Sequence, residues 1–96
     1  MSDEKFRGMR PPVAWFANEM ERQLEANDHK TGWKHFHLKQ LLRRLKQEVG
    51  ELERAIKQGK PNVVEEAADV ANFAMMIADN FHDGQVETRE SEDDKE

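Results

Sequence analysis

Residues 48–69 read EVGELERAIKQGKPNVVEEAAD, and this segment predicts the central feature of the fold. Its middle segment, Gln58-Gly59-Lys60-Pro61, predicts the end of one helix and the start of another. Glycine favours the position just after a helix, and proline is tolerated in a first helical turn but not further inside. Because so short a turn joins them, we expect the two helices to form an antiparallel hairpin.

Two pairs of acidic residues flank this turn at matching distances. Glu48 and Glu51 come before it, and Glu66 and Asp69 follow it. Each pair is spaced i, i+3, which places both side chains on one face of a helix. In an antiparallel hairpin, residues whose numbers have the same sum lie at about the same height, which matches Glu48 with Asp69 and Glu51 with Glu66. We therefore expect four carboxylates to converge on one patch.

Such a patch requires neutralisation. Four facing carboxylates repel one another unless they are protonated or bind cations, and hard divalent metals prefer oxygen ligands. Glu48 and Glu51 taken alone are typical of a solvated helix face, and Asp69 alone is as typical of an ion pair as of a metal ligand. The matched spacing, the symmetry about the turn and the expected burial of the helix that carries Asp69 together favour a metal site.

The pattern of apolar residues predicts an all-α fold with three helices. The first runs from Pro11-Pro12 to about Asn27, the second from about Phe36 to Gln58, and the third starts at Pro61-Asn62. No segment alternates apolar and polar residues as a strand does. The expected architecture is a helical hairpin preceded by an N-terminal helix, which oligomerisation completes to a four-helix-type bundle.

The second helix carries a heptad-like seam, and the third is apolar on nearly all sides. Glu48 lies at the edge of this seam and Glu51 about 60° further around the helix, so both acids flank the packing face. In the third helix, residues 67–78 contain only two polar side chains, Asp69 and Asn72, which predicts burial on nearly all sides. The seam consists of Leu38, Leu42, Leu45, Val49, Leu52 and Ile56, with Leu41 beside it.

The start of the third helix separates two neighbouring acids. Asn62 and Glu65 have the spacing of an N-cap residue and its N3 partner, which is a variant of the capping box. This interpretation gives Glu65 a structural role and leaves Glu66 free to serve the carboxylate patch.

Composition and charge divide the chain into a helical domain and a tail. Residues 83–96 carry seven acids and two bases and account for the whole net charge of −5. We therefore expect a neutral helical domain, residues 1–82, and a disordered acidic tail, residues 83–96. A neutral domain offers no footprint for duplex nucleic acid or for an anionic membrane.

Two further features concern assembly and location. Only 36% of the 96 residues are hydrophobic, which predicts that the chain completes its core as a homo-oligomer, either a dimer or a tetramer. The sequence has no cysteine, and we expect a cytoplasmic protein without a signal peptide or a membrane span.

The acidic motifs also resemble those of a known superfamily. Glu48-Val49-Gly50-Glu51 and Glu66-Ala67-Ala68-Asp69 are similar to the ExxE…ExxD motif of the all-α nucleoside triphosphate pyrophosphohydrolases. This superfamily includes MazG-like proteins, dimeric dUTPases and dCTP pyrophosphatases, and the resemblance covers roughly residues 36–82. Residues 27–33 and 67–76 are most similar to small MazG-like proteins.

The resemblance implies a magnesium-dependent hydrolase. It implies a bundle of at least two protomers, Mg²⁺ on Glu48, Glu51, Glu66 and Asp69 with Mn²⁺ as a substitute, and hydrolysis of a nucleoside triphosphate to the monophosphate and pyrophosphate. Metal ions on these acids bind the triphosphate and orient a water molecule. Glu48 or Glu51, the acids nearer to solvent, accepts the proton of that water.

Four further residues are expected to contact the substrate. Asn72 shares a face with the second acidic pair. Arg44 either touches a phosphate or forms an i, i+4 ion pair with Glu48. Trp33 either stacks on a base or covers the edge of the core. Phe73 either lines the base pocket or packs in the core.

Three functions remain open at this point. The leading hypothesis is a Mg²⁺-dependent nucleotide pyrophosphohydrolase that clears nucleotides from the pool. The second is a non-catalytic helical module for oligomerisation or regulation, whose acids hold a structural cation. The third assigns the function to the acidic tail as an interaction segment. The preferred base and sugar depend on pocket shape and cannot be deduced from the motifs.

Overall fold

The computed structural model describes residues 8–27 and 32–84, which form three helices. These are α1 (Pro11–Ala26), α2 (Leu38–Lys57) and α3 (Val63–His82), and this part of the chain contains no strand. The predicted all-α fold is therefore confirmed. Residues 85–96, most of the predicted acidic tail, and loop residues 28–31 lie outside the described residues. No helix in the described ranges is both long and apolar enough to cross a lipid bilayer.

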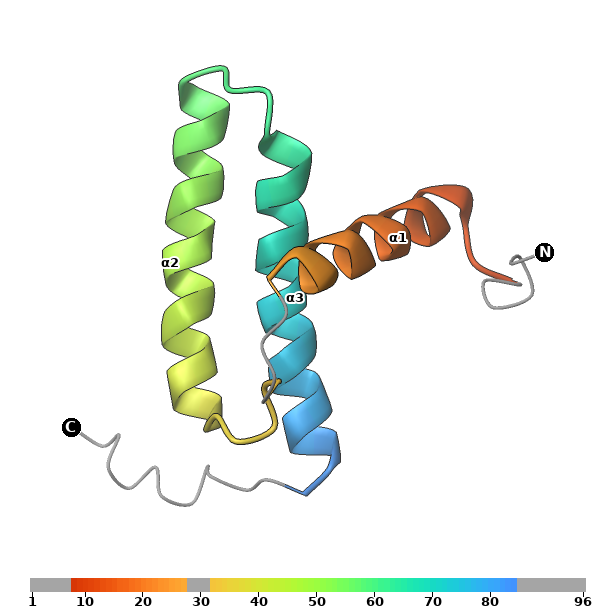
Figure 1. Ribbon diagram of the computed structural model, residues 1–96, viewed down its shortest axis with the longest axis vertical. Coiled ribbons are helices and arrows are strands. Elements are labelled where there is room, and N and C mark those ends of the chain that lie inside the picture. The colour runs from red at the N-terminus through yellow and green to blue at the C-terminus, as the bar shows by residue number, and fades with distance from the viewer. Residues whose placement is uncertain (1–7, 28–31, 85–96) are drawn as a thin grey trace.

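The three helices form a hairpin with a crossing helix. Figure 1 shows α2 and α3 side by side with opposite directions, while α1 crosses α3 and extends away from the hairpin. The predicted order, an N-terminal helix followed by a helical hairpin, is the order observed. Because both α1 and α2 pack on α3, this last helix is the centre of the fold.

The turn between α2 and α3 forms as the sequence predicts. The amide of Lys60 donates to the carbonyl of Ala55 at 2.9 Å, and the amide of Gly59 donates to the carbonyl of Ile56 at 3.2 Å. This pair of bonds is the Schellman motif, which requires a positive φ after the helix, and Gly59 has a φ of 63°. The turn therefore depends on a glycine at this position.

α2 packs against α3 through a face that is rotated relative to the predicted seam. Leu41 and Ala55 are buried, whereas three predicted seam residues are not. Leu42, Val49 and Ile56 are 44%, 47% and 59% exposed, and we refer to them as the open stripe of α2. The predicted seam is therefore only half right: Leu38, Leu45 and Leu52 are partly buried, and the packing face turns from the other three residues toward Ala55. An alanine carries little weight in a hydrophobic pattern even where it packs closely.

The prediction that α3 is buried on nearly all sides is wrong for the single chain. Ala68, Asn72 and Asn80 are its buried residues, and Ala74 and Ala78 are exposed. α2 covers one face of the helix and α1 another, which leaves a third face open. An apolar pattern predicts that a helix is buried by packing against other helices, but it does not predict whether those helices belong to the same chain or to another protomer.

Two buried asparagines of α3 hold the rest of the chain in place. The Nδ2 of Asn72 donates to the carbonyl of Met20 in α1 at 3.0 Å. The Nδ2 of Asn80 donates to the carbonyls of Trp33 and Phe36 at 3.1 Å each. Asn72 therefore ties α1 to α3, and Asn80 ties the segment before α2 to the same helix.

Candidate metal and ligand site

The hairpin brings three of the four predicted carboxylates together. Glu48 of α2 meets Glu66 and Asp69 of α3, and one oxygen of each lies within 4.8 Å of the other two. We refer to these three partly buried residues as the carboxylate triad. No lysine or arginine in the described part of the chain forms an ion pair with any of them.

The fourth predicted carboxylate lies apart from the triad. Glu51 is exposed, and its Oε1 accepts a hydrogen bond from Arg54 at 3.1 Å. The rotation of α2 explains this difference, because Glu48 lies within the packing face and Glu51 is turned further toward solvent. The charge of Glu51 still raises the pKa of Glu48, so Glu51 remains an electrostatic neighbour of the triad.

The start of α3 corrects the predicted capping box. Asn62 is the N-cap residue, but its side chain caps no backbone amide. Its backbone, at φ −99° and ψ 28°, is not in the extended conformation that aims an N-cap side chain at the first helical turn. The Nδ2 of Asn62 instead donates to Oε2 of Glu66 at 2.9 Å. The capping role predicted for Glu65 is therefore wrong, and Glu66 has the partner.

Burial and mutual repulsion hold the triad in an unfavourable electrostatic state. Burial raises the pKa of Glu48 above its ordinary value, and the neighbouring carboxylates, Asp69 first, raise it further against a smaller opposing effect of the Arg44 charge. Burial also raises the pKa of Asp69, to which the charge of Glu66 adds. Carboxylates that resist ionisation for these reasons favour binding of a cation.

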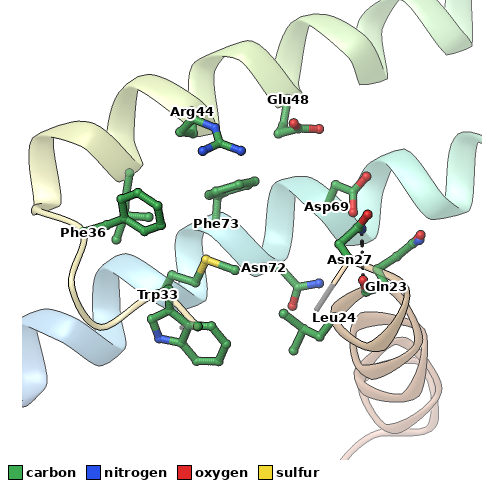
Figure 2. Close-up of a pocket in the computed structure, with 13 residues that line it drawn as sticks. Gln23, Leu24, Asn27, Trp33, Phe36, Arg44, Glu48, Asp69, Asn72 and Phe73 are labelled. Atoms are coloured by element: carbon green, nitrogen blue, oxygen red, sulfur yellow. Dashed lines mark hydrogen bonds between the residues drawn. The ribbon is translucent and has the colours of Figure 1, made fainter. Parts of the chain in front are cut away.

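A cavity of 390 Å³ lies beside the triad. Glu48 and Asp69 line it, and Figure 2 shows these two residues toward one end and Trp33 and Phe36 toward the other. The four predicted substrate contacts all line the same cavity, together with residues that the sequence did not predict. Its remaining lining consists of Gln23, Leu24, Asn27, Gly32, Leu41, Arg44, Asn72, Phe73 and Met76.

Arg44 and Phe73 form one wall of this cavity as a stacked pair. The guanidinium carbon of Arg44 lies 5.1 Å from the centre of the Phe73 ring (Figure 2). Such stacking is a cation–π contact, which holds the guanidinium in place without using its hydrogen-bond donors. The alternative ion pair between Arg44 and Glu48 does not occur in the described structure. Arg44 thus presents a positive charge to the cavity.

Trp33 borders the cavity from the segment before α2. Its Nε1 donates to Oδ2 of Asp79 at 3.0 Å, which fixes the ring. Sequence analysis missed Asp79, and it missed Met76, although Met76 follows Phe73 at helical spacing. The C-terminal end of α1 also lines the cavity, with Gln23, Leu24 and the C-cap residue Asn27. The sequence did not indicate these residues, because their position depends on how α1 crosses α3.

Comparisons with known proteins yield no match. No protein-family model matches the chain, and searches of curated proteins and of solved structures find no relative.

Proposed function

We propose that this protein is a Mg²⁺-dependent nucleotide pyrophosphohydrolase. It cleaves a nucleoside or deoxynucleoside triphosphate to the monophosphate and pyrophosphate, and so clears nucleotides from the pool. The observation that carries the proposal is a carboxylate triad without an ion pair, beside a cavity walled by arginine and aromatic side chains. The resemblance of the two acidic motifs to those of MazG-like proteins supports the same chemistry.

The donor chemistry of the triad fits Mg²⁺. Three carboxylate oxygens within 4.8 Å of one another are a ligand set that a hard divalent cation can share, and Mn²⁺ suits the same ligands. Glu48, Glu66 and Asp69 would hold the metal, and Glu51 would join them only by leaving Arg54. When bound, Mg²⁺ acts as a Lewis acid that offsets the charge of the phosphates.

Glu48 is the residue that we assign as general base. It lines the cavity, whereas Glu51 points to solvent and pairs with Arg54. A general base must lie within hydrogen-bond reach of the proton that it accepts. The oxygen of the attacking water forms a bond to one phosphorus of the anhydride between the α and β phosphates, and its proton passes to a carboxylate oxygen of Glu48. The bond from that phosphorus to the bridging oxygen breaks, which yields the monophosphate and pyrophosphate.

The remaining walls of the cavity suit the other parts of a nucleotide. The donors of Arg44 are free to pair with phosphate oxygens, because stacking on Phe73 leaves them unused. Trp33 and Phe73 offer aromatic surface to a base. A cavity with charged groups at one end and aromatic groups at the other is typical of sites for small amphiphilic ligands.

The working unit is proposed to be a homo-oligomer, a dimer or a tetramer. The open stripe of α2 and the exposed alanines of α3 leave apolar surface uncovered in the single chain. Covering it yields roughly 25 cal/mol per Å² of apolar area, and two hairpins provide the four helices of a bundle. Light scattering measures the mass in solution. A stable monomer with full activity at micromolar concentration would contradict the oligomer without affecting the metal site.

Pyrophosphate release tests the enzymatic proposal. The purified protein is incubated with a panel of ribo- and deoxyribonucleoside triphosphates in the presence of Mg²⁺ or Mn²⁺. We expect pyrophosphate from at least one triphosphate, and no release after chelation of the metal. Absence of release from every triphosphate would contradict the proposal.

One observation favours a second candidate, a non-catalytic oligomerisation or regulatory module with a structural cation site. Leu42, Val49 and Ile56 recur every seven residues and remain exposed, which is typical of a helix that pairs with another helix. In such a module divalent cations would raise the melting temperature or tighten the oligomer, with no turnover of any triphosphate. The same assay, combined with thermal melting, separates the two candidates.

A further inference from the structure

Asn72 is a buried side chain with one unused hydrogen-bonding atom. Only 3% of the residue is exposed. Its Nδ2 donates to the carbonyl of Met20, whereas its Oδ1 is buried and has no hydrogen-bond partner. A buried acceptor costs free energy unless a donor meets it, so an unpaired one requires an explanation.

The bond to Met20 determines which atom of the amide is unpaired. In the flipped orientation Oδ1 would face the carbonyl oxygen of Met20, and two acceptors would repel each other. Nδ2 of Asn72 therefore faces α1, and Oδ1 is the atom that is available to a donor from another group. Asn72 is one of the residues that line the cavity, and Figure 2 shows its side chain extending from α3 toward Leu24 of α1.

The position of Asn72 relative to the triad indicates what meets this acceptor. Asn72 follows Asp69 by three residues on α3, a rise of about 4.5 Å along the helix axis. A nucleotide whose phosphates lie at the triad therefore places its sugar or its base beside Asn72. The aromatic rings of Trp33 and Phe73 fit a planar base but do not distinguish one hydrogen-bonding edge from another.

We propose that Oδ1 of Asn72 selects the substrate by accepting a hydrogen bond from the nucleotide. The donor is an N–H on the edge of the base or a hydroxyl of the sugar. This inference rests on the proposed function, since it takes the ligand to be a nucleotide. A ligand that lacks the donor leaves Oδ1 buried and unpaired, and sites built on such a bond reject such ligands strongly.

Asn80 provides a matched control within the same helix. It is 1% exposed, and its Oδ1 is also buried without a partner. Its Nδ2 binds two backbone carbonyls, those of Trp33 and Phe36, but the side chain does not line the cavity. Replacing Asn80 therefore loosens the segment that carries Trp33 and Phe36 but removes no hydrogen-bond acceptor from the cavity, so it controls for a purely structural loss.

Calorimetric binding of nucleoside monophosphates to the full chain tests the inference, since the proposed reaction does not consume them. The ligand pairs are AMP and purine riboside monophosphate, CMP and its 2-pyrimidinone analogue, UMP and its N3-methyl analogue, and each ribonucleotide with its 2′-deoxy and 3′-deoxy forms. We expect the parent to bind the donor-bearing member of at least one pair roughly tenfold more tightly. Asn72→Leu should bring this ratio close to one, and Asn80→Ala should preserve it.

The outcomes show whether the hydrogen-bond donor belongs to the base or to the sugar, and whether Asn72 accepts the bond. A preference within the base pairs assigns the donor to the base, and one within the sugar pairs assigns it to the sugar. The inference is overturned if the parent binds no monophosphate, binds both members of every pair equally, or keeps its ratio after Asn72→Leu. Because the ratio of the parent depends on changes in the ligand alone, its absence overturns the inference even if a variant fails to fold.

The assay for pyrophosphate release provides the independent readout of the proposed function. Release from triphosphates without any donor preference contradicts the role of Asn72 alone. A donor preference that disappears in Asn72→Leu, without any release, contradicts the hydrolase and supports the acceptor role of Asn72 in a nucleotide-binding protein.

Discussion

Two acidic clusters lie toward the opposite ends of α3, and they differ in their partners: one contains Asp79 and the C-cap residue Asp83, the other Glu66 and Asp69. At the C-terminal end, Nζ of Lys34 lies 2.7 Å from Asp79 and also pairs with Asp83, and the indole of Trp33 donates to Asp79. The hydrogen bonds of Lys34 lower the pKa of both aspartates, and the same bonds raise the pKa of Lys34. These acids are paired, and they fasten the segment before α2.

At the N-terminal end of α3 the acids lack such partners. Glu66 accepts one hydrogen bond from Asn62, and Asp69 forms no ion pair within residues 8–27 and 32–84. Glu48 approaches both from α2, and burial raises the pKa of Glu48 and of Asp69. A cluster of this kind costs stability unless a ligand neutralises it. Acids without a cationic partner, rather than acids as such, therefore mark a candidate site.

The largest effect should follow from neutralising one acid of the triad. Glu66→Gln or Asp69→Asn is expected to lower the rate of pyrophosphate release at least about 100-fold, because a group that stabilises charge in the transition state is lost. Divalent binding, measured by calorimetry, should weaken while the helix content measured by circular dichroism stays near normal. Glu65→Gln is the matched control, since Glu65 is the exposed neighbour of Glu66. Equal losses of activity from Glu65→Gln and Glu66→Gln would contradict the assignment of Glu66, and not Glu65, to the metal site.

The hairpin and most of the triad could be predicted from sequence because local rules determine them. Gly59 ends α2 through its own backbone preference, and i, i+3 spacing fixes the face on which each acid lies. The equal-height rule for antiparallel helices correctly matched Glu48 with Asp69. The prediction was wrong for Glu51, because the orientation of α2 about its axis depends on the packing of Ala55 rather than on the stronger hydrophobic pattern.

The cavity could not be predicted, because contacts between distant segments create it. Asn72 reaches Met20 across 52 positions, and Asn80 reaches Trp33 across 47. No periodicity within one helix encodes such pairings. The orphaned amide oxygens were invisible for the same reason, since burial and hydrogen-bond partners are properties of the packed chain.

A smaller effect is expected for the acid that lies outside the triad. Glu51→Gln should lower pyrophosphate release about tenfold or less, because Glu51 influences the triad only through its charge. Glu53→Gln is the control, since Glu53 is another exposed acid of α2 and pairs with Lys57 at 3.2 Å. Initial rates give both values. A loss as large as that of Asp69→Asn would mean that Glu51 leaves Arg54 in the working enzyme and that four carboxylates act together.

The two acidic clusters should respond to pH with opposite signs. The pKa of Glu48 and of Asp69 is raised above the ordinary values of 4.5 and 3.8, so the metal-free fold is favoured by their protonated forms. This contribution is fully present below the ordinary values and is lost as pH rises through the raised ones. We therefore expect the melting temperature of the metal-free protein to fall as pH rises from the ordinary pKa values through the raised ones. Glu48→Gln should raise the melting temperature by a few degrees at neutral pH.

Saturating Mg²⁺ and the other cluster provide the controls for this measurement. Mg²⁺ should abolish the fall in melting temperature with rising pH, because it binds the ionised form of the triad. The pKa of Asp79 and of Asp83 is lowered, so their contribution is present above 3.8 and is lost as pH falls through the lowered values. Asp79→Asn should therefore lower the melting temperature at neutral pH. A rise after Asp79→Asn, or a fall after Glu48→Gln, would contradict the contrast between the two clusters.

The smallest effect is expected from Lys34→Met at the paired end of α3. The Lys34 side chain is 52% exposed, and solvent and salt screen an ion pair in such a position. Asp79 also keeps its hydrogen bond from Trp33, which is independent of Lys34. We therefore expect a slight drop in melting temperature that fades at high salt, with pyrophosphate release unchanged. Lys57→Met, which removes the exposed pair with Glu53, should behave alike. A loss of activity in Lys34→Met alone would show that the segment before α2 must be held by Lys34 for the cavity to work, and the C-terminal cluster would then be part of the site.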